Sequence, residues 1–285
     1  MRFFSAILLA LISAFAFAPP ANAKVVRDVI YADAPGLDPG DVRADVYIPD
    51  DADNAPVILM MHGGAWTFGN KLSALGMFQA RYFNDQGFVF IAVNYRLSPA
   101  HPFPAQQQDT AAAIAYFHEH ATEFGGDPNS IFLMGHSAGA HMAALTAIDP
   151  DYLDAFDLTP GVIKGVVAMD SAAYNMARTG SDADIPEFYH STFTSDDPDV
   201  WTAASPTLLV EETTDIPPFL LLYVNRAVAP SRAKELAEAL NSAGHKAEAR
   251  LVKNRDHKSL NDRLGAKGDK VAPMIADFFR DQLED

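Results

Sequence analysis

The chain has 285 residues, of which 49% are hydrophobic and 20% are charged, and this composition is typical of a globular protein rather than a disordered one. It contains no cysteine, which excludes disulfides, thiolate metal sites and cysteine nucleophiles. The 37 acidic residues outnumber the 21 basic ones and give a net charge of −16, which argues against binding to nucleic acid or to anionic membrane surfaces.

The acidic residues are unevenly distributed. The stretch from Thr179 to Asn225 contains nine acidic residues and no Lys or Arg. Two interpretations are open: a solvated surface segment, or an acidic rim over a binding site that disfavours anionic substrates.

Residues 1–23 have the pattern of a secretory signal peptide. Arg2 precedes the apolar run Phe3–Ala18, and Ala21-Asn22-Ala23 forms an A-x-A cleavage site that predicts a mature start at Lys24. A retained membrane anchor is the alternative, but the run is shorter than the ~20 residues that span a bilayer. We therefore expect an exported protein, secreted or periplasmic, without stable membrane insertion after cleavage.

Strand and helix patterns alternate along the mature chain. In chain order, the expected elements are strands over Val25–Tyr31, Val42–Ile48 and Val57–Met61, a helix over Leu72–Asn84, a strand over Phe88–Asn94, a helix over Ala105–Glu123, a turn over Asp127–Ser130, a strand over Ile131–Met134, a helix over Ala138–Ile148, strands over Val162–Met169 and Phe219–Val224, a helix over Ser231–Ala243, a strand over Ala247–Val252 and a helix over Val271–Leu283. This alternation predicts an α/β fold: a mostly parallel central sheet with helices on both faces, in one domain over residues 24–285. The segment 170–206 lacks periodicity and is expected to be an irregular insertion, which in a compact domain is usually functional.

The sequence Gly135-His136-Ser137-Ala138-Gly139 matches the G-x-S-x-G pattern. It follows a buried strand and opens a helix, and the strained turn between two such elements requires small residues on both sides of the serine. This context makes Ser137 the candidate nucleophile.

A glycine-rich turn, His62-Gly63-Gly64-Ala65-Trp66, directly follows the strand Val57–Met61. Glycines allow backbone N–H groups to approach a ligand oxygen closely. Together with the N–H of Ala138, just after the serine, Gly63, Gly64 and Ala65 are expected to form an oxyanion hole.

These motifs occur in a familiar order with Asn94–Pro99, His101–Ala105 and Gly125–Pro128. The chain resembles an α/β-hydrolase of the carboxylesterase type, near the hormone-sensitive-lipase-like and the feruloyl- and acetyl-esterase-like groups. The resemblance implies the α/β-hydrolase fold, a Ser–acid–His triad, and ester hydrolysis without a metal or another cofactor. The chain departs from many relatives at Ala65, where a third glycine is common. Because an alanine still supplies its backbone N–H, we expect little effect on the oxyanion hole.

The general base is expected to follow the serine and the acid in the chain. His141, His190, His245 and His257 meet this condition. His141 faces down the helix of the serine, His190 comes too early, and His245 precedes a strand at the wrong edge of the sheet. His257 follows the last strand at the correct edge and is the candidate base.

The acid departs from the pattern of the relatives, which usually carry it after the strand Phe219–Val224. Counting back from Pro230 reaches Arg226 at that position. Asp170 directly follows the strand Val162–Met169 at the same edge as Ser137, so it is the candidate acid. A Ser–His dyad without an acid is the alternative.

The substrate pocket is expected to include Trp66, Tyr95 and His136. The irregular segment contains four aromatic residues that are expected either to line the pocket or to belong to the core: Phe188, Tyr189, Phe193 and Trp201.

The predicted function is that of a serine carboxylesterase that hydrolyses small to medium esters through an acyl-enzyme, with a small-molecule ester as its partner. The oligomeric state is left undetermined. An amide hydrolase of the formamidase or peptidase type is an alternative, and so is a catalytically inactive binding protein, which Arg226 in the acid position would suit.

Overall fold

A computed structural model describes residues 24–33, 37–74, 78–180, 186–193, 197–210 and 215–284. The predicted signal peptide, residues 1–23, lies outside these ranges. The described strands are β1 (Lys24–Ile30), β2 (Arg43–Ile48), β3 (Ala55–Met61), β4 (Val89–Val93), β5 (Gly126–His136), β6 (Ile163–Met169), β7 (Phe219–Tyr223) and β8 (Ala247–Leu251).

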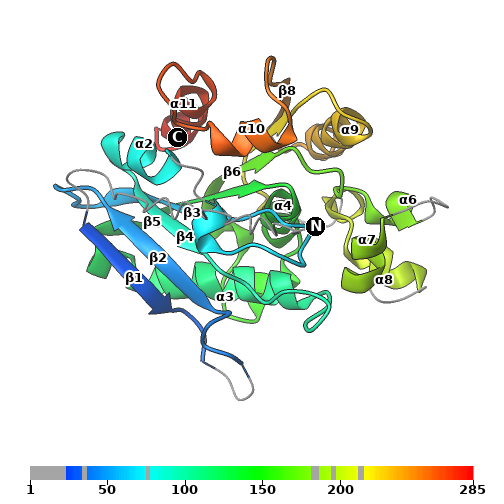
Figure 1. Ribbon diagram of the computed structural model, residues 1–285, viewed down its shortest axis with the longest axis horizontal. Helices are drawn as coiled ribbons and strands as arrows, with labels where there is room; N and C mark the ends of the chain where they lie inside the picture. The colour runs from blue at the N-terminus through cyan, green and yellow to red at the C-terminus, as the bar shows by residue number, and fades with distance from the viewer. Residues whose placement is uncertain are drawn as a thin grey trace, which may run out of the picture.

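The eight strands form one sheet in the order β1-β2-β4-β3-β5-β6-β7-β8 (Figure 1). The pairs β1–β2 and β2–β4 are antiparallel, and the remaining neighbours are parallel. The carboxyl ends of β5, β6, β7 and β8 therefore lie side by side at one edge. Ligands bind at this edge in open α/β sheets.

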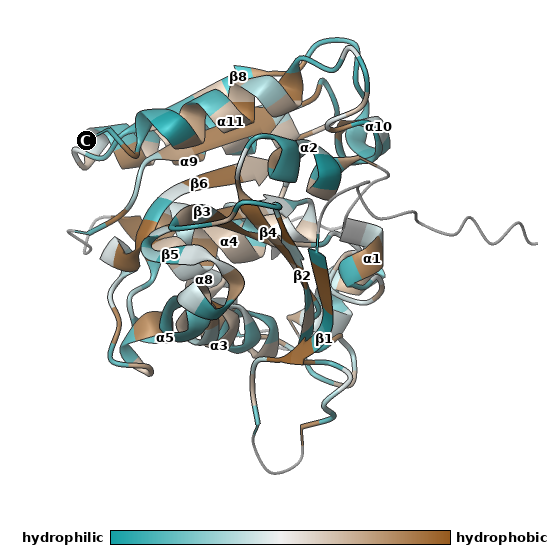
Figure 2. Cartoon of the chain, turned by 90° about the vertical axis from the view of Figure 1, so that its left-hand side faces the viewer, coloured by the Kyte–Doolittle hydropathy of each residue, from teal (hydrophilic) through white to brown (hydrophobic). Residues whose placement is uncertain are grey.

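Helices cover both faces of the sheet, as the strand–helix alternation predicts (Figure 2). Residues of α3, α4 and α9 pack on one face, and those of α2, α10 and α11 pack on the other. The helices are α1 (Lys71–Ala74), α2 (Gln79–Asp85), α3 (Ala105–His120), α4 (Ala138–Ile148), α5 (Asp151–Asp154), α6 (Met176–Gly180), α7 (Glu187–Thr192), α8 (Pro198–Ala203), α9 (Ala229–Ser242), α10 (His257–Asp262) and α11 (Val271–Asp281), with 3₁₀ turns at Ala121–Phe124, Pro160–Val162 and Pro206–Leu208.

Strand β3 shows why the sequence forms a sheet that is buried on both sides. Val57, Leu59 and Met61 join the apolar cluster on one face, and Ile58 and Met60 join the cluster on the other. Each of these side chains is at most 1% exposed, and full burial of such a side chain stabilises a fold by roughly 1.5–3 kcal/mol. A continuous apolar run is the pattern that this position requires.

The structure corrects the expected elements in three places. The helix predicted over Leu72–Asn84 is two short helices, α1 and α2, and the turn predicted over Asp127–Ser130 belongs to β5. The irregular segment 170–206 carries α6, α7 and α8, which are too short to produce a periodic pattern. None of the helices in the described ranges is long and apolar enough to span a bilayer.

Candidate active site

Ser137 sits in a strained turn between β5 and α4, with φ 57° and ψ −116°. A Cβ atom on Gly135 would lie 2.2 Å from the carbonyl oxygen of Gly139, and one on Gly139 would lie 2.1 Å from that of Met61. Only glycine fits both positions, as the motif predicts. The N–H of Ser137 donates to the carbonyl oxygen of Met169 at 2.9 Å, which ties the turn to the end of β6.

The three candidate triad residues form one hydrogen-bonded chain. Nε2 of His257 lies 3.0 Å from Oγ of Ser137, and its Nδ1 lies 2.6 Å from Oδ2 of Asp170. Because a carboxylate only accepts, Nδ1 carries the proton and Nε2 is left to accept the hydroxyl proton of Ser137. The three residues follow β5, β6 and β8 at the same edge of the sheet.

Asp170 is a buried carboxylate with several donors around it. Its Oδ1 accepts from the N–H of Val224 at 3.0 Å, and its Oδ2 accepts from Nε of Arg226 at 2.6 Å as well as from His257. Burial by itself raises the pKa of Asp170, but the hydrogen bonds from His257, Arg226 and Val224 outweigh it. The pKa of this carboxyl therefore lies below its usual value of 3.8.

The turn after β3 lies opposite the serine. Ala65 has a φ of 49° and Gly64 a φ of 127°. Gly63 lies so close to the serine turn that an added Cβ would be 3.1 Å from Cβ of Ser137. In the described part of the chain, the N–H groups of Gly64, Ala65 and Ala138 have no hydrogen-bond acceptor, so they are available to a ligand oxygen.

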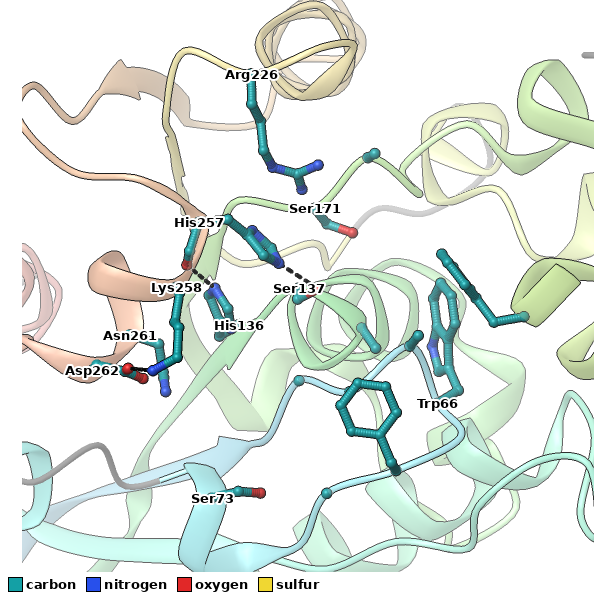
Figure 3. A pocket seen from close by; sticks show the side chains of 18 of the residues that line it. Trp66, Ser73, His136, Ser137, Ser171, Arg226, His257, Lys258, Asn261 and Asp262 are labelled. Atoms are coloured by element: carbon teal, nitrogen blue, oxygen red, sulfur yellow. Dashed lines mark hydrogen bonds and ion pairs between the residues drawn. The ribbon is translucent and has the colours of Figure 1, made fainter. Parts of the chain in front are cut away.

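A pocket of about 500 Å³ opens over Ser137. All four predicted oxyanion-hole residues line it, and so do Trp66 and His136. Figure 3 shows two unlike sides: Trp66 lies on one, whereas Lys258, Asn261 and Asp262 lie on the other, beside His257. Phe188 and Tyr189 also line the pocket, while Phe193 and Trp201 are buried in the core.

His136 lines the pocket and also supports the candidate base. Its Nε2–H donates to the carbonyl oxygen of His257 at 2.8 Å, and the two ring centroids are 4.5 Å apart. Burial lowers the pKa of His136 to about 4, so the ring is neutral at neutral pH.

The prediction that Tyr95 lines the pocket is wrong. Its ring is 2% exposed, stacks on His62 with ring centroids 4.1 Å apart, and donates its hydroxyl to the carbonyl oxygen of His62 at 2.8 Å. Tyr95 therefore supports the glycine-rich turn from below. The reason is packing: the stack on His62 and the hydrogen bond to its carbonyl oxygen hold the ring against the turn and away from the pocket.

Two features of the site were missed by sequence reasoning. Helix α10 begins at His257, and the Asp256 side chain caps it by accepting from the N–H of Ser259 at 2.7 Å. The signal was an acidic residue three positions before a serine, a short capping pattern. The other feature is the contact of Arg226 with Asp170, which the sequence carried no signal for.

Among the described residues, no three His, Asp or Glu side chains gather closely enough to hold a metal ion. The pocket brings together a hydroxyl with an adjacent imidazole, a buried carboxylate and free N–H donors.

The BD-FAE family model matches residues 44–240 of the chain. The chain belongs to the BD-FAE family. This BD-FAE protein is 30% identical to "Esterase LipQ" of Mycobacterium tuberculosis over 239 residues, which are 79% of this chain and 55% of the relative. It is 28% identical to the "Isoprenylcysteine alpha-carbonyl methylesterase ICME" of Arabidopsis thaliana over 254 residues, 83% of this chain and 57% of the relative.

The BD-FAE chain thus spans little more than half the length of the curated relatives it matches. Among solved structures, it resembles a truncated carbohydrate esterase from gut microbiota with a TM-score of 0.75 and 23% identity, over 94% of this chain and 99% of that one. Esterase B of Lactobacillus rhamnosis has a TM-score of 0.75 with 18% identity, over 94% and 88%. These likenesses confirm the α/β-hydrolase fold.

Proposed function

We propose that this BD-FAE protein is a serine carboxylesterase, which hydrolyses small to medium carboxylic esters through an acyl-enzyme. The observation that carries the proposal is the hydrogen-bonded chain from Oγ of Ser137 through His257 to Asp170 beside free backbone donors. Such a chain activates a hydroxyl that is otherwise a weak nucleophile.

In the first half of the reaction, Ser137 Oγ attacks the acyl carbon of the ester while Nε2 of His257 takes its proton. The negative charge on the carbonyl oxygen is stabilised by the N–H groups of Gly64, Ala65 and Ala138; one such donor contributes about 3 kcal/mol in related sites. Asp170 stabilises the imidazolium, which then gives its proton to the leaving alcohol as the ester C–O bond breaks.

In the second half, water attacks the acyl-enzyme and gives one proton to Nε2 of His257. The imidazolium returns this proton to Oγ of Ser137 as the acyl–serine bond breaks, and the carboxylic acid is released. The same three side chains act twice, so each turnover consumes one water and restores the enzyme.

The names of the relatives support an ester as the substrate, since each describes an esterase or a methylesterase. The pocket volume of about 500 Å³ suits a small to medium ester. The main argument for a catalytically inactive binding protein was the arginine at the usual position of the acid. That argument no longer holds, because Arg226 contacts Asp170, an acid at a neighbouring position.

The proposal is tested by hydrolysis of p-nitrophenyl acetate and p-nitrophenyl butyrate by the purified protein and its Ser137→Ala variant. We expect turnover by the parent protein and loss of at least about 10⁴-fold in the variant. A p-nitroanilide of the same acyl group distinguishes an amide hydrolase. Equal rates for the parent protein and the variant would exclude a serine esterase.

We also propose that residues 1–23 direct export of the protein to the periplasm or the medium. Support comes from the basic start, the short apolar run and the A-x-A site in the sequence. Mass spectrometry of the protein recovered outside the cytoplasm tests this: a mature chain that begins at Lys24 is expected, and an intact Met1 in the cell fraction would contradict it.

A further inference from the structure

Arg226 follows β7 and turns its side chain back over the end of β6. Its Nε donates to Oδ2 of Asp170 at 2.6 Å, and its Nη2 donates to the backbone carbonyl oxygen of the same residue at 2.8 Å. The guanidinium thus donates hydrogen bonds to both the side chain and the main chain of Asp170. Figure 3 shows Arg226 on the rim of the pocket, next to His257 and Ser171.

Asp170, which accepts these two hydrogen bonds, has a strained backbone and a deeply buried side chain. Asp170 has a φ of 56°, and its side chain is 0% exposed, whereas that of Arg226 is 33% exposed. A buried carboxylate needs a compensating charge and full hydrogen bonding. Arg226 is the permanent cation in contact with this carboxylate, and it is fixed in a two-point geometry that a lysine cannot reproduce.

Arg226 and His257 donate to the same oxygen, Oδ2, each at 2.6 Å. The Val224 N–H holds Oδ1 at 3.0 Å. Three donors therefore hold the two oxygens, and Arg226 is one of the groups that fix the orientation of the carboxylate relative to the imidazole.

We propose that Arg226 is a positioning residue for the esterase reaction: it keeps Asp170 ionised and its Oδ2 aimed at Nδ1 of His257. This inference rests on the proposed function. Arg226 occupies the position after β7 where the resemblance implies an acid. Its side chain contacts Asp170, the acid that follows the neighbouring strand β6. Arg226 contacts the triad acid, and we expect its effect on turnover to pass through that acid.

The ionisable groups around Asp170 other than His257 and Arg226 do not change their charge near neutral pH, which makes a pH test of Asp170 interpretable. Burial lowers the pKa of His136 on β5 to about 4. Burial raises the pKa of Tyr174, which follows β6, and that of Tyr189 on α7. Near neutral pH these three neighbours are uncharged, and the Arg226 guanidinium is in direct contact with the carboxylate of Asp170.

The test is a double-mutant cycle between Arg226→Met and Asp170→Asn, with Arg226→Lys as the variant that retains the charge. We expect Arg226→Met to lower kcat for p-nitrophenyl butyrate at least about tenfold, with KM within about twofold of the parent value. The acid limb of its pH profile should move to higher pH, because loss of the cation favours proton uptake by Asp170. Arg226→Lys should keep the parent acid limb and recover part of kcat.

In the Asp170→Asn background, Arg226→Met should cost nothing further, because its effect passes through Asp170. An equal loss in both backgrounds, or a rise in KM that accounts for the loss, would overturn the proposal in favour of direct substrate contact. An unchanged kcat in a folded Arg226→Met protein would overturn it too. Arg226→Gln replaces Arg226→Met if the unpaired buried carboxylate prevents folding.

A readout without turnover separates this proposal from the proposed function. The downfield proton resonance of His257 Nδ1 reports the hydrogen bond to Asp170 directly. We expect it to shift or broaden in Arg226→Met and to disappear in Asp170→Asn. A resonance that Arg226→Met leaves unchanged would overturn the role of Arg226, whereas an inactive parent protein with a normal resonance would overturn the esterase function alone.

Discussion

His136, the residue before the candidate nucleophile, donates a hydrogen bond to the backbone of the candidate base: its Nε2 lies 2.8 Å from the carbonyl oxygen of His257. The end of β5 thereby supports the start of α10. The position of the imidazole of His257 depends on two neighbours, Asp170 at Nδ1 and His136 at the main chain.

The first prediction follows from this contact. His136→Leu removes the donor and should lower kcat about tenfold, which corresponds to one hydrogen bond of about 1.4 kcal/mol, while His136→Gln keeps an N–H donor and should lose less. Steady-state kinetics with p-nitrophenyl butyrate measure the effect. A change confined to KM would assign His136 to substrate binding instead.

The second prediction concerns the cap of helix α10. Because α10 begins at His257, loss of the Asp256 side chain frees the first turn and loosens the candidate base. Asp256→Ala should lower kcat several-fold, whereas Asp256→Asn, which is also a good cap, should stay near the parent value. The cap carboxylate is stabilised by its hydrogen bonds to Ser259, which lower the pKa of Asp256. Equal activity of the two variants would show that the cap does not position His257.

The third prediction compares two glycines. A methyl group on Gly139 would lie 2.1 Å from the carbonyl oxygen of Met61, so Gly139→Ala should force α4 away from β3, abolish activity and destabilise the fold by about 3 kcal/mol. The matched control is Gly161→Ala, whose added Cβ would have its nearest contact at 3.3 Å and should change stability by less than about 0.5 kcal/mol. Urea unfolding measures both, and similar values would refute the steric argument.

The fourth prediction concerns stability in mild acid. Burial lowers the pKa of His62, His136 and His141 from 6.5 to about 4. Below pH 6.5 the unfolded chain takes up protons that the folded protein does not, so the free energy of unfolding should fall as the pH drops from 6.5 toward 4, on the order of 3 kcal/mol per histidine. The depressed pKa of Asp170 acts in the same direction at lower pH.

His141 is the residue on which to test this, because it donates through Nε2 to the carbonyl oxygen of Ala204, away from the triad. His141→Gln keeps a donor and removes one titrating group. The slope of unfolding free energy against pH, measured by urea unfolding between about pH 5 and pH 6, should decrease by about 1.4 kcal/mol per pH unit. An unchanged slope would show that His141 is already protonated in the folded state.

The sheet and the arrangement of Ser137, Asp170 and His257 could be predicted because they depend on local patterns and strand order. Solid apolar runs identify parallel strands, and residues that follow neighbouring strands meet at one edge. Tyr95 was misplaced for a different reason. Its position after β4 was right, but the direction of its side chain depends on packing against His62, which a one-dimensional pattern does not contain.

The contact of Arg226 with Asp170 could not be predicted for the same reason. The sequence shows an arginine where an acid is expected, and nothing in the pattern indicates that its side chain reaches the end of the neighbouring strand. Helix α10 and the helices of the segment 170–206 are at most six residues long, so periodicity is undetectable there and only caps signal them.

The strands β5, β6, β7 and β8 are neighbours in the sheet in the order in which they occur in the chain, and Ser137, Asp170, Arg226 and His257 follow them one by one. The ends of β6 and β7 therefore lie side by side, and Asp170, which contacts the imidazole of His257, is within reach of Arg226. Asp170 and Arg226 thus form an ion pair between two neighbouring strand ends, and an exchange of the two residues would leave the nucleophile, the base and the chain connectivity unchanged. The sheet therefore offers two adjacent backbone positions for the acid of the triad, and this chain places its carboxylate at the one that follows β6.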